Sequence, residues 1–217
     1  MTLTARAATR HAAVLAIAGA LYACATSDRV ALPSPPPVER PAFAVGDRWV
    51  FTGPSGRSEM TYQGRRGETL VFRVVFQPTS GTPARGETLY SAELSHVKEA
   101  RIENRPDDGE LRFPLAVGRS WRHQFVRTVS QGGAPPNEEH VSVEATVAAY
   151  ERIRVPAGEL DAFRIESVVT SPSLSQKATY WYAPAMKTVI RHRAETAAGR
   201  TGLILERAQL AEFEAAR

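Results

Sequence analysis

Histidine is the residue type in this sequence that is best suited to acid–base or metal chemistry. Beyond the N-terminal apolar run the chain has four histidines, His96, His123, His140 and His192. None belongs to an H-x-H or H-E-x-x-H pattern, the compact spacings that bring two imidazoles to one metal ion. His123 and His192 fall on the inward faces of predicted strands, which leaves two alternatives. Either they meet near a carboxylate such as Glu166, as in an envelope hydrolase or metal-dependent enzyme, or each is a separate core histidine with one hydrogen-bond partner.

The other reactive residue types favour the second alternative. The sequence has no G-x-S-x-G motif, which would place a nucleophilic serine on a sharp turn. Asp107 and Asp108 stand beside Gly109 and Glu110, but they lack the alternating oxygen ligands of a calcium-binding loop, so we predict a solvated turn there. We therefore expect a protein that is not an enzyme, with no catalytic residue, no metal site and no cofactor.

A group of large aromatic residues is the best candidate for a ligand-binding site. It consists of Trp121, Tyr180, Trp181 and Tyr182. Aromatic side chains with a polar tip line pockets well, because they offer both apolar surface and a hydrogen bond. The alternative is that the same residues pack in the core.

Cys24 is the only cysteine, and its position indicates a chemical role. It follows a basic start with Arg6 and Arg10, an apolar run over residues 12–21, and the small residue Ala23. The run is too short to cross a bilayer, which needs about 20 apolar residues. The stretch Leu21-Tyr22-Ala23-Cys24 resembles the signal of bacterial lipoproteins.

That resemblance implies signal cleavage between Ala23 and Cys24. The Cys24 thiol would then carry diacylglycerol and its freed amine an acyl chain such as palmitate, and each buried CH₂ contributes about 0.8 kcal/mol to membrane binding. The next residue is Ala25 rather than Asp, which by the same resemblance predicts sorting to the outer membrane. The domain would face the periplasm, with exposure at the cell surface as the alternative.

Net charge gives no reason to expect a nucleic-acid partner. The 217 residues carry a formal charge of +4, and residues 1–23 contain Arg6 and Arg10 but no acidic residue. Cleavage would therefore leave a chain closer to neutrality than the full sequence is. Nucleic-acid binding is typical of strongly basic domains.

Composition divides the chain into four parts. We expect a signal peptide over 1–23, a Pro-rich extended tether over 24–41, a single β domain over 42–212 and a tail over 213–217. A short repeat, Val45-Gly46-Asp47-Arg48-Trp49 and Val117-Gly118-Arg119-Ser120-Trp121, leaves open whether the domain has two related halves, 42–112 and 113–212.

The apolar residues of the domain alternate with a period of two. The pattern is clearest over residues 69–77 and 140–150, and Gly- or Pro-containing turns separate the alternating segments. The prediction is an all-β fold, an antiparallel curved sheet that forms a half-barrel or sandwich of about 10 to 12 strands. A short helix over 206–217 is the alternative for the C-terminus, because Leu210 and Phe213 are three residues apart.

Two motifs in the second half carry a family resemblance. The stretch 155–163 contains V-P-A-G-E-L, residues 181–184 read W-Y-A-P, and Gly118 to Trp121 form an upstream G-x-x-W. The combination resembles a family of uncharacterised bacterial periplasmic lipoproteins with all-β domains. At the level of the fold it is similar to the lipoprotein carriers LolA and LolB. The resemblance implies a non-catalytic protein that binds an apolar ligand or an envelope protein partner.

Overall fold

The computed structural model describes residues 29–173, 175–196 and 203–216. Ala23 and Cys24, on which the lipoprotein prediction depends, lie outside the described residues. Within the described ranges there are thirteen strands and one 3₁₀ helix, η1 (Pro184–Met186). No helix in this part of the chain has the length and hydropathy needed to cross a membrane.

The strands come in the following order along the chain. They are β1 (Arg29–Ala31), β2 (Arg48–Gly53), β3 (Gly56–Arg66), β4 (Thr69–Pro78), β5 (Ala84–Tyr90), β6 (His96–Glu99), β7 (Ile102–Arg105), β8 (Ser120–Val129), β9 (Asn137–Val155), β10 (Gly158–Thr170), β11 (Ser175–Ala183), β12 (Thr188–Thr196) and β13 (Leu203–Glu214). The predicted all-β class is confirmed.

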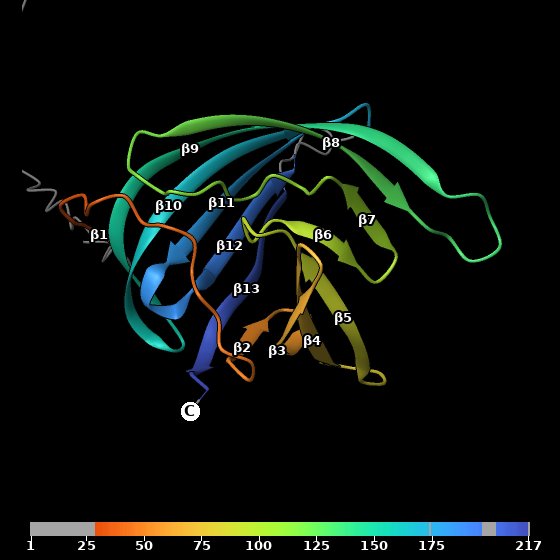
Figure 1. The fold of residues 1–217 in the computed structure, drawn as a ribbon, viewed down its shortest axis with the longest axis horizontal. Coiled ribbons are helices and arrows are strands. Elements are labelled where there is room, and N and C mark those ends of the chain that lie inside the picture. Colours follow the sequence, from red (N-terminus) through yellow and green to blue (C-terminus); the bar gives the residue numbers. More distant parts are fainter. Residues whose placement is uncertain (1–28, 174, 197–202, 217) are drawn as a thin grey trace, which may run out of the picture.

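The sheet closes into an antiparallel barrel (Figure 1). Each strand from β2 to β13 pairs with its neighbour in sequence, including β8 with β9, and one further pairing, of β13 with β2, closes the ring. The sequence predicts a curved antiparallel sheet but leaves open whether it closes, and the structure shows that it does. Alternation along a strand fixes which face is buried, but it does not determine whether the two edges of a sheet meet.

The C-terminal segment is strand β13 rather than a helix. An extra residue, Ala211, bulges between Leu210, which opposes Phe51, and Glu212, which opposes Val50. Because of the bulge, Leu210 and Phe213 face the same side although they are three residues apart, and Phe213 packs on Trp49 with ring centroids 5.5 Å apart. A spacing of three was therefore ambiguous between a helix and a bulged strand.

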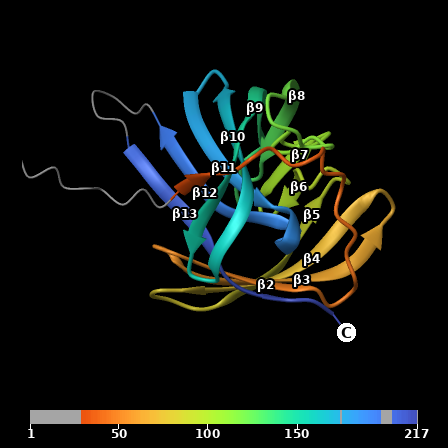
Figure 2. The same ribbon diagram turned by 90° about the vertical axis from the view of Figure 1, so that its left-hand side faces the viewer.

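The described part of the Pro-rich segment lies against the barrel instead of extending away from it (Figure 2). β1 pairs with residues 151–153 of β9, and Leu32 donates its N–H to Tyr150 O at 3.0 Å. Further on, Val38 and Leu115 exchange two backbone hydrogen bonds, of 2.9 and 2.8 Å. Residues 29–32 thus occupy the edge of β9 that β8 leaves unpaired.

The turn before β2 and the turn before β8 have the same local structure. Gly46 and Gly118 both have positive φ, +101° and +88°, which L-amino acids with a side chain rarely adopt. In each turn the residue after the glycine bonds back to the third residue before it, from Asp47 to Ala44 and from Arg119 to Ala116. The repeated Gly-x-x-Trp sequence thus forms the same type of turn before each of the two strands.

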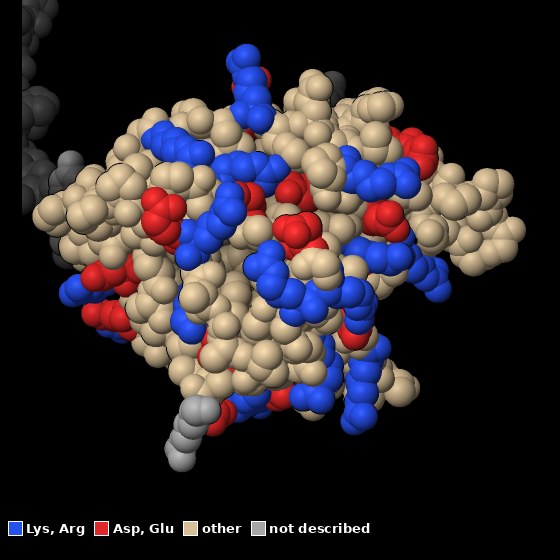
Figure 3. Space-filling model, viewed as in Figure 1, with Lys and Arg blue, Asp and Glu red and all other residues tan. Residues whose placement is uncertain are grey.

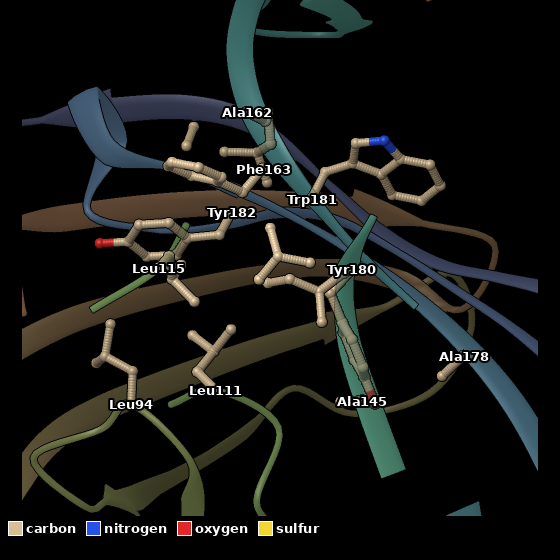
Figure 4. Close-up of a cluster of buried hydrophobic side chains, with 14 of the residues drawn as sticks. Leu94, Leu111, Leu115, Ala145, Ala162, Phe163, Ala178, Tyr180, Trp181 and Tyr182 are labelled. Atoms are coloured by element: carbon tan, nitrogen blue, oxygen red, sulfur yellow. The ribbon is translucent and has the colours of Figure 1, made fainter. Parts of the chain in front are cut away.

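The inward faces of the strands form an aromatic-rich core. Its largest fully buried side chains include Trp49, Tyr182, Phe72 and Phe163. Figure 4 shows part of this cluster around Tyr180, Tyr182 and Leu111. Each such side chain contributes roughly 1.5–3 kcal/mol through burial.

Candidate functional site in the barrel interior

Two chambers lie inside the barrel and share four residues at their boundary. The first has a volume of about 230 Å³ and is lined mainly by apolar side chains, among them Trp49, Met60, Phe72, Leu94, Leu111 and Val189. The second, of about 320 Å³, is lined by more polar groups, including Asn104, Asp108, Arg127, Ser167, Gln176 and Tyr180. The residues that border both chambers are His96, Glu99, Glu110 and His192. The interior is therefore amphipathic.

His96 and Asp108 form the centre of this boundary. The His96 N–H donates to Asp108 Oδ1 at 2.9 Å, and the Glu110 N–H donates to the same oxygen at 3.2 Å. The other carboxylate oxygen, Oδ2, lies 3.3 Å from His96 Nδ1, and Glu110 Oε2 lies 3.7 Å from that nitrogen. One imidazole and two carboxylates thus converge on one point.

The environment of His96 favours its protonated form. Burial alone would lower the pKa of His96, but the hydrogen-bonding carboxyl groups of Asp108 and Glu110 outweigh burial and hold the pKa well above 6.5. The Tyr90 ring packs against the imidazole with centroids 4.3 Å apart, and burial raises the pKa of Tyr90 to about 12. Tyr90 is therefore a neutral aromatic wall at physiological pH.

Local hydrogen bonds bring these residues together from two segments. Ser95 Oγ donates to Leu111 O and accepts from Leu111 N, both at 3.0 Å, so the segment after β7 folds back beneath the start of β6. Leu94, next to Ser95, has a positive φ of +57°, which is uncommon for a bulky residue. This turn is strained, as backbones near functional sites often are.

The four aromatic residues predicted to bind a ligand do not form one pocket. Tyr180 lines the polar chamber and stacks near His192, with ring centroids 4.4 Å apart. Tyr182 packs edge-on against Phe113 in the core. Trp121 donates its indole N–H to Gly109 O at 2.9 Å and lines an open surface pocket.

Trp181 points to the other side of β11 from Tyr180 (Figure 4). Its indole N–H donates to Glu151 Oε1 at 2.7 Å, and the Arg191 guanidinium lies 5.3 Å from its ring centroid. Glu151 also forms an ion pair with Arg164, whose Nε lies 3.4 Å from Oε1. Trp181 is only 3% exposed, so it belongs to a buried polar cluster on the outer face rather than to the cavity.

His123 has a structural role. Arg112 Nη2 lies 3.0 Å from His123 Nδ1, and because arginine can only donate, Nδ1 accepts and Nε2 carries the proton. Nε2 then donates to Asp107 O at 2.8 Å. Asp107 is 6% exposed and pairs with Arg112 at 2.6 Å, so the predicted solvated turn at Asp107 and Asp108 is wrong.

The enzyme alternative built on His123, His192 and Glu166 is not assembled. His192 opposes Tyr180, which in turn opposes Ile165, and this row faces the interior. Glu166 follows Ile165 in the strand and therefore points outward, where it pairs with Arg164. His192 and His96 both line the boundary between the two chambers, and His123 lines neither chamber.

The residues missed from sequence are His96, Asp108 and Glu110. The usable signal was the closeness of the two carboxylates in Asp108-Gly109-Glu110, and Gly109 between them has a positive φ of +69°. Nothing in the sequence links them to His96, because the link depends on the fold-back at Ser95.

Comparison with known proteins yields similarity at the level of the fold. No protein-family model and no curated protein sequence matches the chain. A solved protein from Bacteroides fragilis, described as exported and as having a YmcC-like fold, superposes with a TM-score of 0.50 at 13% identity, over 82% of this chain and 99% of that one. YmcC from Escherichia coli, described as a hypothetical lipoprotein, gives a TM-score of 0.47 at 15% identity, over 76% and 83% of the two chains. At these identities the similarity concerns the fold alone.

Proposed function

We propose that this protein is a lipid-anchored lipoprotein of a bacterial envelope whose barrel binds a small amphipathic molecule and catalyses no reaction. The proposal rests on one observation. An apolar chamber and a polar chamber adjoin each other, and both are lined by His96, Glu99, Glu110 and His192. An apolar group would lie among Phe72, Leu111 and their neighbours, and a hydrogen-bonding head would lie in the polar chamber.

Chamber size limits the ligand class. Sites for drug-sized molecules usually have volumes of about 300–1,000 Å³, and the apolar chamber measures about 230 Å³. It therefore suits one short apolar or aromatic group, and it is too small for a complete multi-chain lipid. This favours a small amphiphile over the lipid cargo that the resemblance to LolA and LolB would imply.

The anchor is part of the same proposal. The Cys24 signal supports it, and the description of the Bacteroides fragilis protein of similar fold as exported agrees with it. Metabolic labelling with a palmitate analogue should mark the full chain, and Cys24→Ser should abolish the label. Ala25→Asp should move the labelled protein from the outer to the inner membrane fraction. Label that persists in Cys24→Ser would contradict the anchor.

A cavity-filling variant tests the ligand site. Ala208 lines the apolar chamber and opposes His192, whereas the next residue, Gln209, opposes Arg191, on the other face of the strand. A chain that begins at Thr26 and keeps every described residue would be titrated with N-phenyl-1-naphthylamine, a small aromatic amine whose fluorescence rises in apolar surroundings. We expect saturable binding that is at least ten-fold weaker in Ala208→Phe and unchanged in Gln209→Phe. Equal effects of the two variants would contradict the site.

Basic and acidic side chains are interspersed on the face shown in Figure 3. A mixed surface of this kind keeps a domain soluble and gives a protein partner no single-sign patch to recognise on that face. Binding of an envelope protein therefore has less support than binding of a small molecule in the interior.

A further inference from the structure

Three potential metal ligands are gathered at one point of the polar chamber. His96 Nδ1, a carboxylate oxygen of Asp108 and one of Glu110 all lie within 4.8 Å of one another. Ligands of a tetrahedral Zn²⁺ with bonds of about 2.1 Å are about 3.4 Å apart, and the separations from His96 Nδ1 are 3.3 Å to Asp108 and 3.7 Å to Glu110. The two separations from the imidazole are thus near the spacing that one ion would impose, and the two carboxylate oxygens lie within 4.8 Å of each other.

The ligands are held in place by contacts that metal binding would not disturb. Asp108 Oδ1 accepts two backbone N–H groups, which orients Oδ2 toward His96 Nδ1. The imidazole is fixed by the Tyr90 ring on one side and by its own backbone bonds to Asp108 on the other. Preorganisation of this kind is typical of metal sites, in which surrounding hydrogen bonds orient the ligands.

These distances alone have a simpler explanation, an imidazolium ion paired with two carboxylates. That explanation does not account for the side-chain oxygen of Asn104. Its side chain is in the same chamber, the residue is 4% exposed, and its Nδ2 donates to His96 O at 3.2 Å. Its Oδ1 is buried without a hydrogen-bond partner among the described residues. Buried amide oxygens are nearly always satisfied, so this one indicates an absent partner.

The donor types in this chamber match those that bind a divalent cation. An amide oxygen and carboxylates are ligands for hard divalent ions, and an imidazole shifts the preference toward first-row transition metals. Glu99 adds a further acidic group to the chamber wall, and Arg127 is the one arginine or lysine side chain among the residues that line this chamber.

We propose that the polar chamber is a divalent metal site for Zn²⁺ or a similar transition ion, with His96 Nδ1, Asp108 Oδ2 and Glu110 Oε2 as ligands and Asn104 Oδ1 as an additional oxygen donor. The site goes beyond the proposed binding of an amphiphile and does not depend on it. It uses His96 rather than the His123 and His192 pair considered from the sequence. Its role in this proposal is binding, and no reaction is assigned to it.

The test is a calorimetric titration of the full chain with Zn²⁺ at a fixed pH. The protein would be solubilised in detergent, purified without a polyhistidine tag and stripped with a chelator. The variants are His96→Gln, Glu110→Gln and the control His140→Gln, which removes an exposed histidine on β9. Circular dichroism would verify that each variant folds, and Glu110→Gln keeps the test valid if His96→Gln does not.

We expect one Zn²⁺ per chain, affinity at least ten-fold lower in His96→Gln and in Glu110→Gln, and no change in His140→Gln. The absence of stoichiometric binding in the unmodified chain would overturn the proposal. Binding retained in both site variants would also overturn it, since the ion would then be held elsewhere. Neither result depends on whether an aromatic amine binds, so failure of the metal site and failure of the amphiphile site are distinguishable.

Discussion

His96 and Asp108 are joined by reciprocal backbone contacts. The His96 N–H donates to Asp108 Oδ1, and the Asp108 N–H donates to His96 O, both at 2.9 Å. These two bonds attach the segment before β8 to the start of β6. They determine which side chains reach the boundary between the chambers.

The Asp108 carboxylate is therefore expected to stabilise the fold through its hydrogen bonds more than through its charge. Asp108→Asn keeps an oxygen for the N–H groups of His96 and Glu110, whereas Asp108→Ala leaves both without an acceptor. At roughly 1 kcal/mol per hydrogen bond, Asp108→Ala should lower the free energy of unfolding by about 2 kcal/mol, and Asp108→Asn by less than half of that. Urea unfolding of metal-free protein measures both values. Equal losses would show that the charge dominates.

Protonation of the Asp47 carboxyl should make the free energy of unfolding depend on pH. Burial would raise the pKa of its carboxyl, but the N–H groups of Ala216 and Ala44 and the Lys187 ammonium outweigh burial and lower it. A lowered folded pKa gives stability that is present above the unfolded value of about 3.9 and is lost as the pH falls through the folded value. Asp47→Asn should cost about 1–3 kcal/mol at neutral pH, because it removes the charge of a carboxylate that accepts hydrogen bonds from two N–H groups and from the half-buried Lys187 ammonium, and much less near pH 2.

The matched control for Asp47 is Asp161→Asn. Asp161 also has a carboxyl pKa lowered by its pairing, here with Arg152, but that ion pair is solvent-exposed. Exposed pairs contribute at most about 1 kcal/mol, so this variant should change stability little at any pH. Urea unfolding at several pH values compares the two. A loss in Asp47→Asn that does not vary with pH would contradict the role given to the charge.

Trp181 should affect stability without affecting ligand binding. Trp181→Phe removes the indole N–H that donates to the buried Glu151 carboxylate, which should cost about 1–3 kcal/mol. The side chain points away from the chambers, so the affinity for N-phenyl-1-naphthylamine should stay within a factor of two. A ten-fold loss of affinity at unchanged stability would restore Trp181 to the ligand site.

Gly109 is expected to tolerate no side chain. It has φ of +69°, and a Cβ there would lie 2.4 Å from His123 Cδ2. Gly67 is the control, because its φ of +59° is similar but nothing lies within 4 Å of the added atom. Gly67→Ala should cost about 1 kcal/mol through backbone conformation alone, and Gly109→Ala should cost at least about 1–3 kcal/mol more through overpacking. Thermal unfolding of the two variants provides the comparison, and equal losses would contradict the steric argument.

The alternation of apolar residues was enough to predict the strands. A period of two, as in β4 and β9, places the apolar residues on one face only if the segment is a β-strand. The V-P-A-G-E turn was predictable for a similar reason: Gly158 has the positive φ that the β9–β10 hairpin requires. In both cases the information lies within one strand or one turn.

The features that the sequence did not predict depend on contacts between distant segments. Barrel closure requires β13 to meet β2, and binding of the Pro-rich segment requires the free edge of β9. The convergence of His96 with Asp108 and Glu110 depends on the Ser95 hydrogen bonds to Leu111. Periodicity contains no information about such pairings.

The central claim is that the barrel interior is a binding site, and methyl NMR tests it most directly. Leu94, Leu111 and Val189 line the apolar chamber, whereas Val30, Val117 and Val168 are exposed on the outside. Addition of N-phenyl-1-naphthylamine to methyl-labelled protein should shift the first three signals in a saturable manner and leave the second three unchanged. Shifts confined to the exposed valines, or no saturable shift in either group, would contradict the claim.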